Sequence, residues 1–210
     1  MGFKEEDLYG VPARIFRISF SGELAYEINV ESGYGVFMWE KIIELGKEMN
    51  IEPYGTEALS TLRIEMGHVA GSEIDGRTIP SDLSLDGMLS KKKDFIGKRS
   101  LTRSDIIKGD RKQLVGLVPL NKAYGIEEGQ QVIEEKNLNT PIKKPVKMLG
   151  HVTSSYFSPT LNHSVAMALI KGGNRKIGSQ LFVSTSDLNV IPVEVVKPNF
   201  IDPKNERLLS

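Results

Sequence analysis

The residues best suited to chemistry surround Glu27, in the stretch Ser19-Phe20-Ser21-Gly22-Glu23-Leu24-Ala25-Tyr26-Glu27-Ile28. One carboxylate can accept two adjacent N–H donors side by side, as the edge of a flat, nitrogen-rich ring such as a pterin presents them. Tyr26 stands beside Glu27, and Phe20, seven positions before Glu27, could supply an aromatic wall for such a ring. The alternative is that Glu27 is an ordinary solvated acid on a β-strand.

Other charged residues with candidate roles are Arg63 and the run Lys91, Lys92 and Lys93. Arg63 could hold a ligand carboxylate through a two-pronged hydrogen bond, because its guanidinium presents a planar fork of donors. It could equally anchor its helix or pair with a neighbouring acid. The three lysines could meet an acidic ligand tail, or they could form a solvated charge run.

The composition excludes several classes of site. The chain has 210 residues and no cysteine, and its 27 basic and 27 acidic residues balance. Disulfides, thiolate catalysis and Cys-type zinc sites are therefore excluded, and no overall basic field favours nucleic acid. We expect no metal site, because the three histidines, His68, His151 and His163, are far apart in sequence.

Neither a membrane nor a secretory role is indicated. No apolar run approaches the roughly 20 residues that a membrane span needs. The N-terminal residues 1–7 are largely acidic and lack an apolar signal core. These features favour the cytoplasm, and we expect neither a membrane nor a nucleic acid among the partners. The phosphate-binding, dinucleotide-binding and nucleophile-elbow glycine motifs are also absent.

The first half of the chain mixes strands and helices. Residues 14–20 alternate apolar and polar side chains, Ser21-Gly22 breaks the pattern, and residues 24–30 return, which predicts a β-hairpin. Two helices are expected next, and the second opens after Gly55 and ends at Gly67. Their predicted apolar stripes are Met38, Ile42, Leu45 and Met49, widened by Trp39 and Ile43, and then Ala58, Leu59, Leu62 and Met66. Residues 71–80 should be irregular, and a short helix is expected near residues 99–107.

The second half changes to short strands separated by turns. The expected strands are residues 113–120, 131–135, 147–155, 164–169, 180–184 and 190–196. Such regular spacing predicts a small barrel or a sandwich. We place the boundary at the polar stretch Gly109 to Lys112, which gives an α+β domain over residues 1–109 and a β domain over residues 110–210.

Five ordered motifs resemble the glycine-cleavage T-protein (aminomethyltransferase) family. They are the stretch around Glu27, Leu62-Arg63-Ile64-Glu65-Met66-Gly67, Asp75-Gly76-Arg77-Thr78-Ile79-Pro80, the basic loop at residues 93–98, and Gly150-His151-Val152-Thr153-Ser154-Ser155 with the residues up to Leu161. The run from Gly22 to Glu27 and the ending Phe200-Ile201-Asp202-Pro203 are most similar to the branch that contains sarcosine oxidase alpha subunits. Dimethylglycine dehydrogenases are similar as well.

The resemblance implies a ferredoxin-like, T-protein-type α+β domain followed by a small antiparallel β-barrel. It implies tetrahydrofolate as the bound cofactor, with Glu27 as the pterin-binding acid and Phe20, Tyr26 and Arg63 beside it. A family arginine corresponds to Leu59 here, and a tryptophan of some T-proteins corresponds to a position near Gly87. Both contacts are lost, which argues against ordinary aminomethyltransferase activity.

The family's catalytic aspartate belongs to an N-terminal domain, so we expect no catalytic residue in this chain and little turnover by the chain alone. In the resembling oxidases a flavin on other domains or subunits oxidises the amine, and the T-protein-like region captures the one-carbon unit. The expected partners are folate, other sarcosine oxidase subunits or the N-terminal part of the alpha subunit. A non-catalytic folate-binding module and an interaction subunit without a ligand remain as alternatives.

Overall fold

The computed structural model describes residues 2–134, 146–187 and 189–209. The chain divides into two compact units, Met1–Arg63 with Asp202–Ser210, and Ile64–Ile201. Within the described ranges, none of the helices has the length and apolar composition that crossing a bilayer requires.

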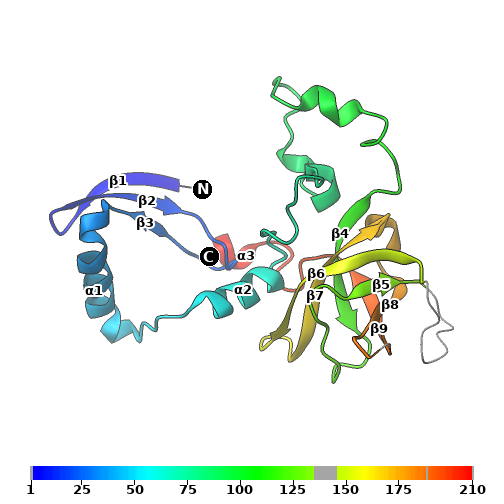
Figure 1. Cartoon of the computed structure of the whole chain (residues 1–210). Helices are drawn as coiled ribbons and strands as arrows, with labels where there is room; N and C mark the ends of the chain where they lie inside the picture. Colours follow the sequence, from blue (N-terminus) through cyan, green and yellow to red (C-terminus); the bar gives the residue numbers. More distant parts are fainter. Residues whose placement is uncertain (1, 135–145, 188, 210) are drawn as a thin grey trace. The chain divides into compact units, whose positions relative to one another are not determined.

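The first unit contains an antiparallel sheet of three strands, in the order β1 (Gly2–Leu8), β2 (Val11–Arg17) and β3 (Glu27–Asn29) (Figure 1). Tyr9 and Gly10 connect β1 to β2, and both have positive φ, at 57° and 82°. A two-residue turn with this backbone suits the right-handed twist of a hairpin. Strand β1 was not predicted from the sequence.

The predicted hairpin around Glu27 is confirmed in its pairing, but its first strand begins and ends three residues earlier than expected, and its second strand is shorter. Ile15 of β2 lies opposite Ile28 of β3, and residues 18–26 form the connection between the two strands. A turn inside that connection is closed where the Gly22 amide donates to the Ser19 hydroxyl over 2.9 Å. The break at Ser21-Gly22 is therefore real, but it sits inside a longer loop.

Both predicted helices are present. They are α1 (Gly35–Gly46) and α2 (Thr56–Glu65). A third, one-turn helix, α3 (Glu206–Leu209), belongs to the same unit, and its Leu208 carbonyl accepts a hydrogen bond from the Arg17 guanidinium. The predicted apolar stripe of α1 is buried at Met38 only, while Trp39 stays 57% exposed. In α2 the buried positions cluster at the end, from Arg63 to Glu65, with Met66 buried directly after the helix, and Ala58 is exposed rather than inward.

The second unit is built on a closed six-stranded barrel (Figure 1). Every pair of neighbouring strands is antiparallel, in the order β4-β7-β6-β5-β8-β9. The strands are β4 (Lys112–Pro119), β5 (Gln131–Ile133), β6 (Met148–Ser158), β7 (His163–Lys171), β8 (Gln180–Ser184) and β9 (Val190–Val196). All six predicted strands are confirmed, and the open choice between barrel and sandwich is decided for the barrel. Residue 135 of the second prediction lies outside the described residues.

Strand β7 is buried on both faces. Its alternate residues Ala166, Ala168 and Ile170 belong to the barrel core, while Val165, Met167 and Leu169 form a second apolar cluster with Ile64, Leu83 and Leu114. Ile64 and Leu83 come from the segment before the barrel, so this segment covers the outer side of β7. A strand covered on both faces reads as a continuous apolar run, as residues 165–170 do.

The connections contain short 3₁₀ turns. The irregular stretch over residues 71–80 is confirmed, and the short helix expected near residues 99–107 is a 3₁₀ turn that begins one residue earlier and ends at Thr102. The 3₁₀ turns are η1 (Ser32–Tyr34), η2 (Lys47–Met49), η3 (Pro80–Leu83), η4 (Asp86–Met88), η5 (Lys98–Thr102) and η6 (Gly173–Lys176).

Candidate functional site

Glu27 begins strand β3, which pairs only with β2 in its sheet and is therefore an edge strand. It lies directly opposite Phe16 of β2, and Phe16 lies opposite Phe3 of β1. Residues directly opposite one another in an antiparallel sheet share a face. The Phe3 and Phe16 rings are 5.0 Å apart, so Glu27 ends a cross-strand row that begins with two packed aromatic rings.

The Glu27 side chain is exposed. Across the described residues, its carboxylate has neither a hydrogen bond nor an ion pair with the chain. An exposed carboxylate beside an aromatic surface can accept N–H donors from a planar ring that stacks on that surface. The geometry therefore allows the role that the sequence suggests for Glu27.

Phe20 and Tyr26 lie in the connection that leads into β3. Tyr26 immediately precedes Glu27 and is 58% exposed, and Phe20 is 42% exposed. Large aromatic side chains on the surface are candidates for ligand or protein contacts when they cluster. The hairpin therefore holds three of the four predicted site residues close together along the chain.

A broad pocket of about 790 Å³ opens on the same sheet. Its lining includes Glu5, Asp7, Arg14 and Asn29, which share the Glu27 face by strand register. Asn29 lies two residues beyond Glu27 on β3, so the pocket adjoins the aromatic row. Arg14 is bonded to Glu5 over 3.2 Å. The lining is charged and polar, which suits a polar ligand better than a lipid.

Arg63, the fourth predicted residue, lies on another element, two residues before the end of α2. It is only 7% exposed. Its two interpretations, ligand contact and helix anchor, both remain predictions. Leu59 is half-buried and Gly87 is exposed. The correspondence of Leu59 to a family arginine, and of a position near Gly87 to a family tryptophan, stays a prediction. The three lysines at 91–93 are exposed.

Several buried acids were not identified as important from the sequence. The Glu65 carboxylate is 1% exposed and accepts hydrogen bonds from the Ser158 and Thr160 hydroxyls, the latter over 3.1 Å. Glu73 is fully buried and accepts from the Ser154 hydroxyl over 2.6 Å and the Ala70 amide over 2.8 Å. These acids tie the segment before the barrel to β6 and to the turn after it.

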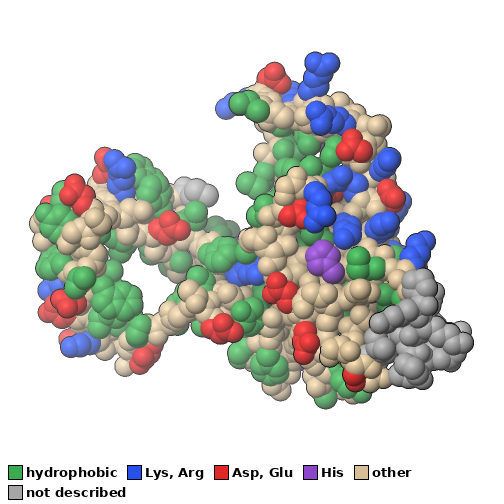
Figure 2. Space-filling view, viewed as in Figure 1, with side chains coloured by type: hydrophobic (Ala, Val, Ile, Leu, Met, Phe, Trp, Pro, Cys, Tyr) green, Lys and Arg blue, Asp and Glu red, His purple; other side chains and the backbone are tan. Residues whose placement is uncertain are grey.

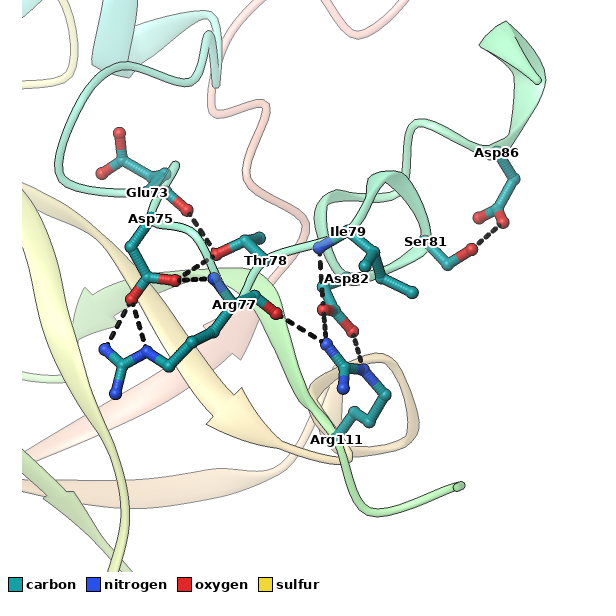
Figure 3. Close-up of polar contacts among 9 residues, drawn as sticks. All are labelled: Glu73, Asp75, Arg77, Thr78, Ile79, Ser81, Asp82, Asp86 and Arg111. Carbon is teal, nitrogen blue, oxygen red and sulfur yellow. Dashed lines mark hydrogen bonds and ion pairs between the residues drawn. The ribbon is translucent and has the colours of Figure 1, made fainter. Parts of the chain in front are cut away.

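A further polar cluster precedes the barrel (Figure 3). Asp82 is 4% exposed, and Arg111 donates to its two oxygens over 2.9 and 2.5 Å. Asp75 accepts from the Arg77 guanidinium and from the Arg77 amide, and these bonds hold the pKa of the Asp75 carboxyl far below its usual value. Among the residues that the structure describes, no three potential metal ligands are grouped to hold an ion.

Two parts of the sequence match models of known protein families. Residues 1–93 match the family model of the GCVT N-terminal domain, and residues 112–202 match that of the glycine cleavage T-protein C-terminal barrel domain. The chain belongs to the glycine-cleavage T-protein family. The resemblance drawn from the five motifs is confirmed.

Relatives of two kinds are similar to this T-protein family member. Sarcosine oxidase subunit alpha of Corynebacterium sp. (strain P-1) is 41% identical over 99% of the chain, and that of Rhizobium meliloti (strain 1021) is 41% identical over 98%. Each match covers 21% of the relative, so the chain spans about a fifth of those subunits. The aminomethyltransferase of Thermoanaerobacter pseudethanolicus is 31% identical over 82% of the chain and 44% of the relative.

A solved structure agrees with the fold. The glycine cleavage system aminomethyltransferase T from Bartonella henselae matches with a TM-score of 0.75 and 25% identity, over 90% of this chain and 50% of that one. The prediction of a T-protein-type α+β part followed by an antiparallel barrel is thereby confirmed. The chain carries domains of the type found in sarcosine oxidase subunit alpha and in aminomethyltransferases.

Proposed function

We propose that this chain is the folate-binding C-terminal portion of a sarcosine oxidase alpha subunit, and that it helps transfer the one-carbon unit of the oxidised amine to tetrahydrofolate. The similarity to those subunits extends over 99% of the chain. Because the chain spans 21% of them, we assign the amine oxidation and its flavin to the remaining domains or subunits. Those domains and subunits are the proposed partners, and the cytoplasm is the proposed compartment.

The observation that carries the proposal is the place of Glu27. Its carboxylate is exposed, bonded to no other described group, and aligned with the Phe3 and Phe16 rings on one sheet face. A pterin edge offers adjacent N–H donors, and a carboxylate can accept two of them. Phe20 and Tyr26 add exposed aromatic surface to the same hairpin, and Arg63 is proposed to meet the carboxylate end of the ligand.

The chain is not expected to turn over substrate alone. The proposal gives it a binding role, with no catalytic side chain and no metal. Leu59 in place of the family arginine removes one charged contact to the ligand. We also propose residues 1–109 and 110–210 as the two domains in this role, a division that falls between the two family matches.

The test is a calorimetric titration with tetrahydrofolate, on the chain and on its complex with the remaining subunits. Losing a hydrogen bond to a charged group costs about 1.5–3 kcal/mol, so Glu27→Gln should weaken binding by about 10- to 150-fold. The matched control is Glu40→Gln, at an acid on α1 that is also exposed, and this variant should bind as the native chain does. Equal affinity of the Glu27→Gln variant and the native chain would remove Glu27 from the site.

A second function, a non-catalytic folate-binding or interaction module, is favoured by exposed apolar side chains on α1 and after it. Val36 is 72% exposed, Trp39 57% and Met49 78%. Apolar surface of this kind is typical of protein contacts. One-carbon transfer to tetrahydrofolate by the assembled complex separates the two: transfer that survives Glu27→Gln unchanged favours the module. A complex without saturable folate binding favours an interaction subunit.

A further inference from the structure

The outer face of the barrel carries a row of basic side chains next to the segment that covers it. Lys112 of β4 lies directly opposite Lys171 of β7, so the two ammonium groups share a face. Like charges directly opposite one another destabilise a sheet. In Figure 2, Lys and Arg side chains gather over the segment before β4 and over the beginning of β4.

His151 of β6 belongs to the same outer face. It lies opposite Leu169 of β7, and Leu169 lies opposite Leu114, two residues after Lys112 on β4. By strand register, Lys112, Lys171 and His151 therefore surround Leu169 on three adjacent strands. On the other side of β6, His151 lies opposite Gln131 of β5. Gln131 is neutral, so β5 adds no acid to the row.

A pocket of about 240 Å³ opens at this place, and His151, Lys112 and Leu169 line it together with Asp75, Arg77 and Arg111. Both acids that face the pocket are already engaged. Asp75 is bonded to Arg77, and Asp82, at the rim, is bonded to Arg111 (Figure 3). These ion pairs neutralise the two arginines and leave the charge of Lys112 at the pocket and that of Lys171 beside it.

We propose that this pocket binds a compact oxyanion, a phosphate or a carboxylate group, between Lys112, Lys171 and His151. Each lysine ammonium carries three N–H donors and an imidazolium carries two, so these side chains offer up to eight charged donors, which is the chemistry that binds such groups. Leu169 adds apolar surface to the lining, and charges attract one another more strongly beside apolar surface than in bulk water. The site is independent of the folate proposal, and its failure would leave that proposal untouched.

The electrostatics of His151 agree with this assignment. Burial lowers the pKa of His151, and the charges of Lys112 and Arg77 lower it further, against an opposing effect of Asp75. A bound anion would offset those positive charges and raise the pKa. The affinity for the anion should therefore increase as the pH falls through the His151 titration, by proton linkage.

The experiment uses the 210-residue chain and two probes, inorganic phosphate and glutarate, which stand for the two sources of oxyanion. Calorimetry measures the affinity of the native chain and of every variant, and NMR of the His151 ring protons follows the titrations of the chains that keep this residue. We expect saturable binding of one probe, weakened about ten-fold by either Lys112→Gln or Lys171→Gln, since each removes a charged hydrogen bond. His151→Gln should abolish the pH dependence of glutarate binding, because this dicarboxylate does not itself titrate near the ordinary pKa of histidine.

The matched control is Lys122→Gln, an exposed lysine in the connection after β4, which should leave the affinity unchanged. Thermal unfolding of each variant verifies that the barrel is intact. Two results would overturn the proposal: titration curves that do not saturate for either probe, or a loss of affinity in Lys122→Gln equal to that in the other lysine variants. Either result would mean that the basic side chains attract anions without forming a specific site. Whichever probe binds more tightly identifies the source.

Discussion

The ion pair between Asp82 and Arg111 should contribute strongly to the stability of the second unit. The Asp82 side chain is 5% exposed and that of Arg111 is 21% exposed, so the pair is largely screened from water. Asp82→Ala removes both acceptors of the guanidinium, and it also removes the acceptor of the Ile79 amide. Arg111 keeps one bond, to the Arg77 carbonyl.

These contacts set the expected magnitude. Removing one partner of a buried ion pair costs about 3–5 kcal/mol, because the other charge stays buried without compensation. The remaining bond of Arg111 and its partial exposure place the cost near the lower end. Losing the acceptor of the Ile79 amide adds about 1 kcal/mol, as for the loss of a helix cap. We expect Asp82→Ala to lower the free energy of unfolding by about 4 kcal/mol in total.

Urea denaturation followed by circular dichroism measures this quantity. The control is Glu134→Gln in the exposed ion pair with Lys176, where the acid is 65% exposed and the expected loss is under about 1 kcal/mol. A double-mutant cycle with Arg111→Met isolates the interaction, because coupled neighbours are not additive. A loss below about 1 kcal/mol in Asp82→Ala, or strict additivity in the cycle, would refute the reasoning.

Three further substitutions test the barrel and its cover. Gly150→Ala would place Cβ 1.9 Å from the Leu169 carbonyl oxygen, so we expect urea denaturation to show a free energy of unfolding lower by about 3 kcal/mol. The control is Gly125→Ala, whose Cβ meets nothing within 4 Å and which should cost under about 0.5 kcal/mol. Glu65→Ala leaves two hydroxyl donors without an acceptor and opens a cavity. Thermal and urea unfolding should show a free energy of unfolding lower by about 2–4 kcal/mol. Burial, with nearby positive charge, holds the pKa of His151 below 6.5. As the pH falls below 6.5, the unfolded chain therefore takes up a proton at this residue before the folded chain does. The contribution of a neutral His151 to the free energy of unfolding is thus present above pH 6.5 and lost below it. His151→Gln should flatten that dependence when unfolding free energies are compared on both sides of pH 6.5.

The barrel was predictable because each of its strands is a local pattern. Residues 190–196 are rich in β-branched side chains and contain one acid, Glu194, and residues 165–170 form a short apolar run, each bounded by turn residues. Strand β1 was not predicted because its sequence lacks such a pattern. Six of its seven residues are exposed, and its centre reads Lys-Glu-Glu-Asp, which resembles a solvated tail. Charged side chains on an edge strand protect it from pairing with other chains, and they also hide its pattern.

The buried acids were beyond the reach of local patterns. Glu65 accepts from a serine 93 positions later in the chain, and Glu73 from one 81 positions later. A helix period shows which side chains share a face, but it does not show what covers that face. For this reason the α1 stripe was expected to be inward, and the structure buries Met38 while leaving Trp39 exposed.

The same contrast separates structural acids from ligand-binding acids. Glu65, Glu73 and Asp82 are buried, each is bonded to donors of the chain, and the part of the chain that the structure describes has no buried side-chain polar atom without a partner. Glu27 is exposed and has no such donor among the described residues. Removing its charge should therefore leave the free energy of unfolding within about 0.5 kcal/mol of the native value. A Glu27→Gln variant that unfolds more easily and loses folate in proportion would place Glu27 with the structural acids, whereas lost affinity at unchanged stability is what a ligand contact requires.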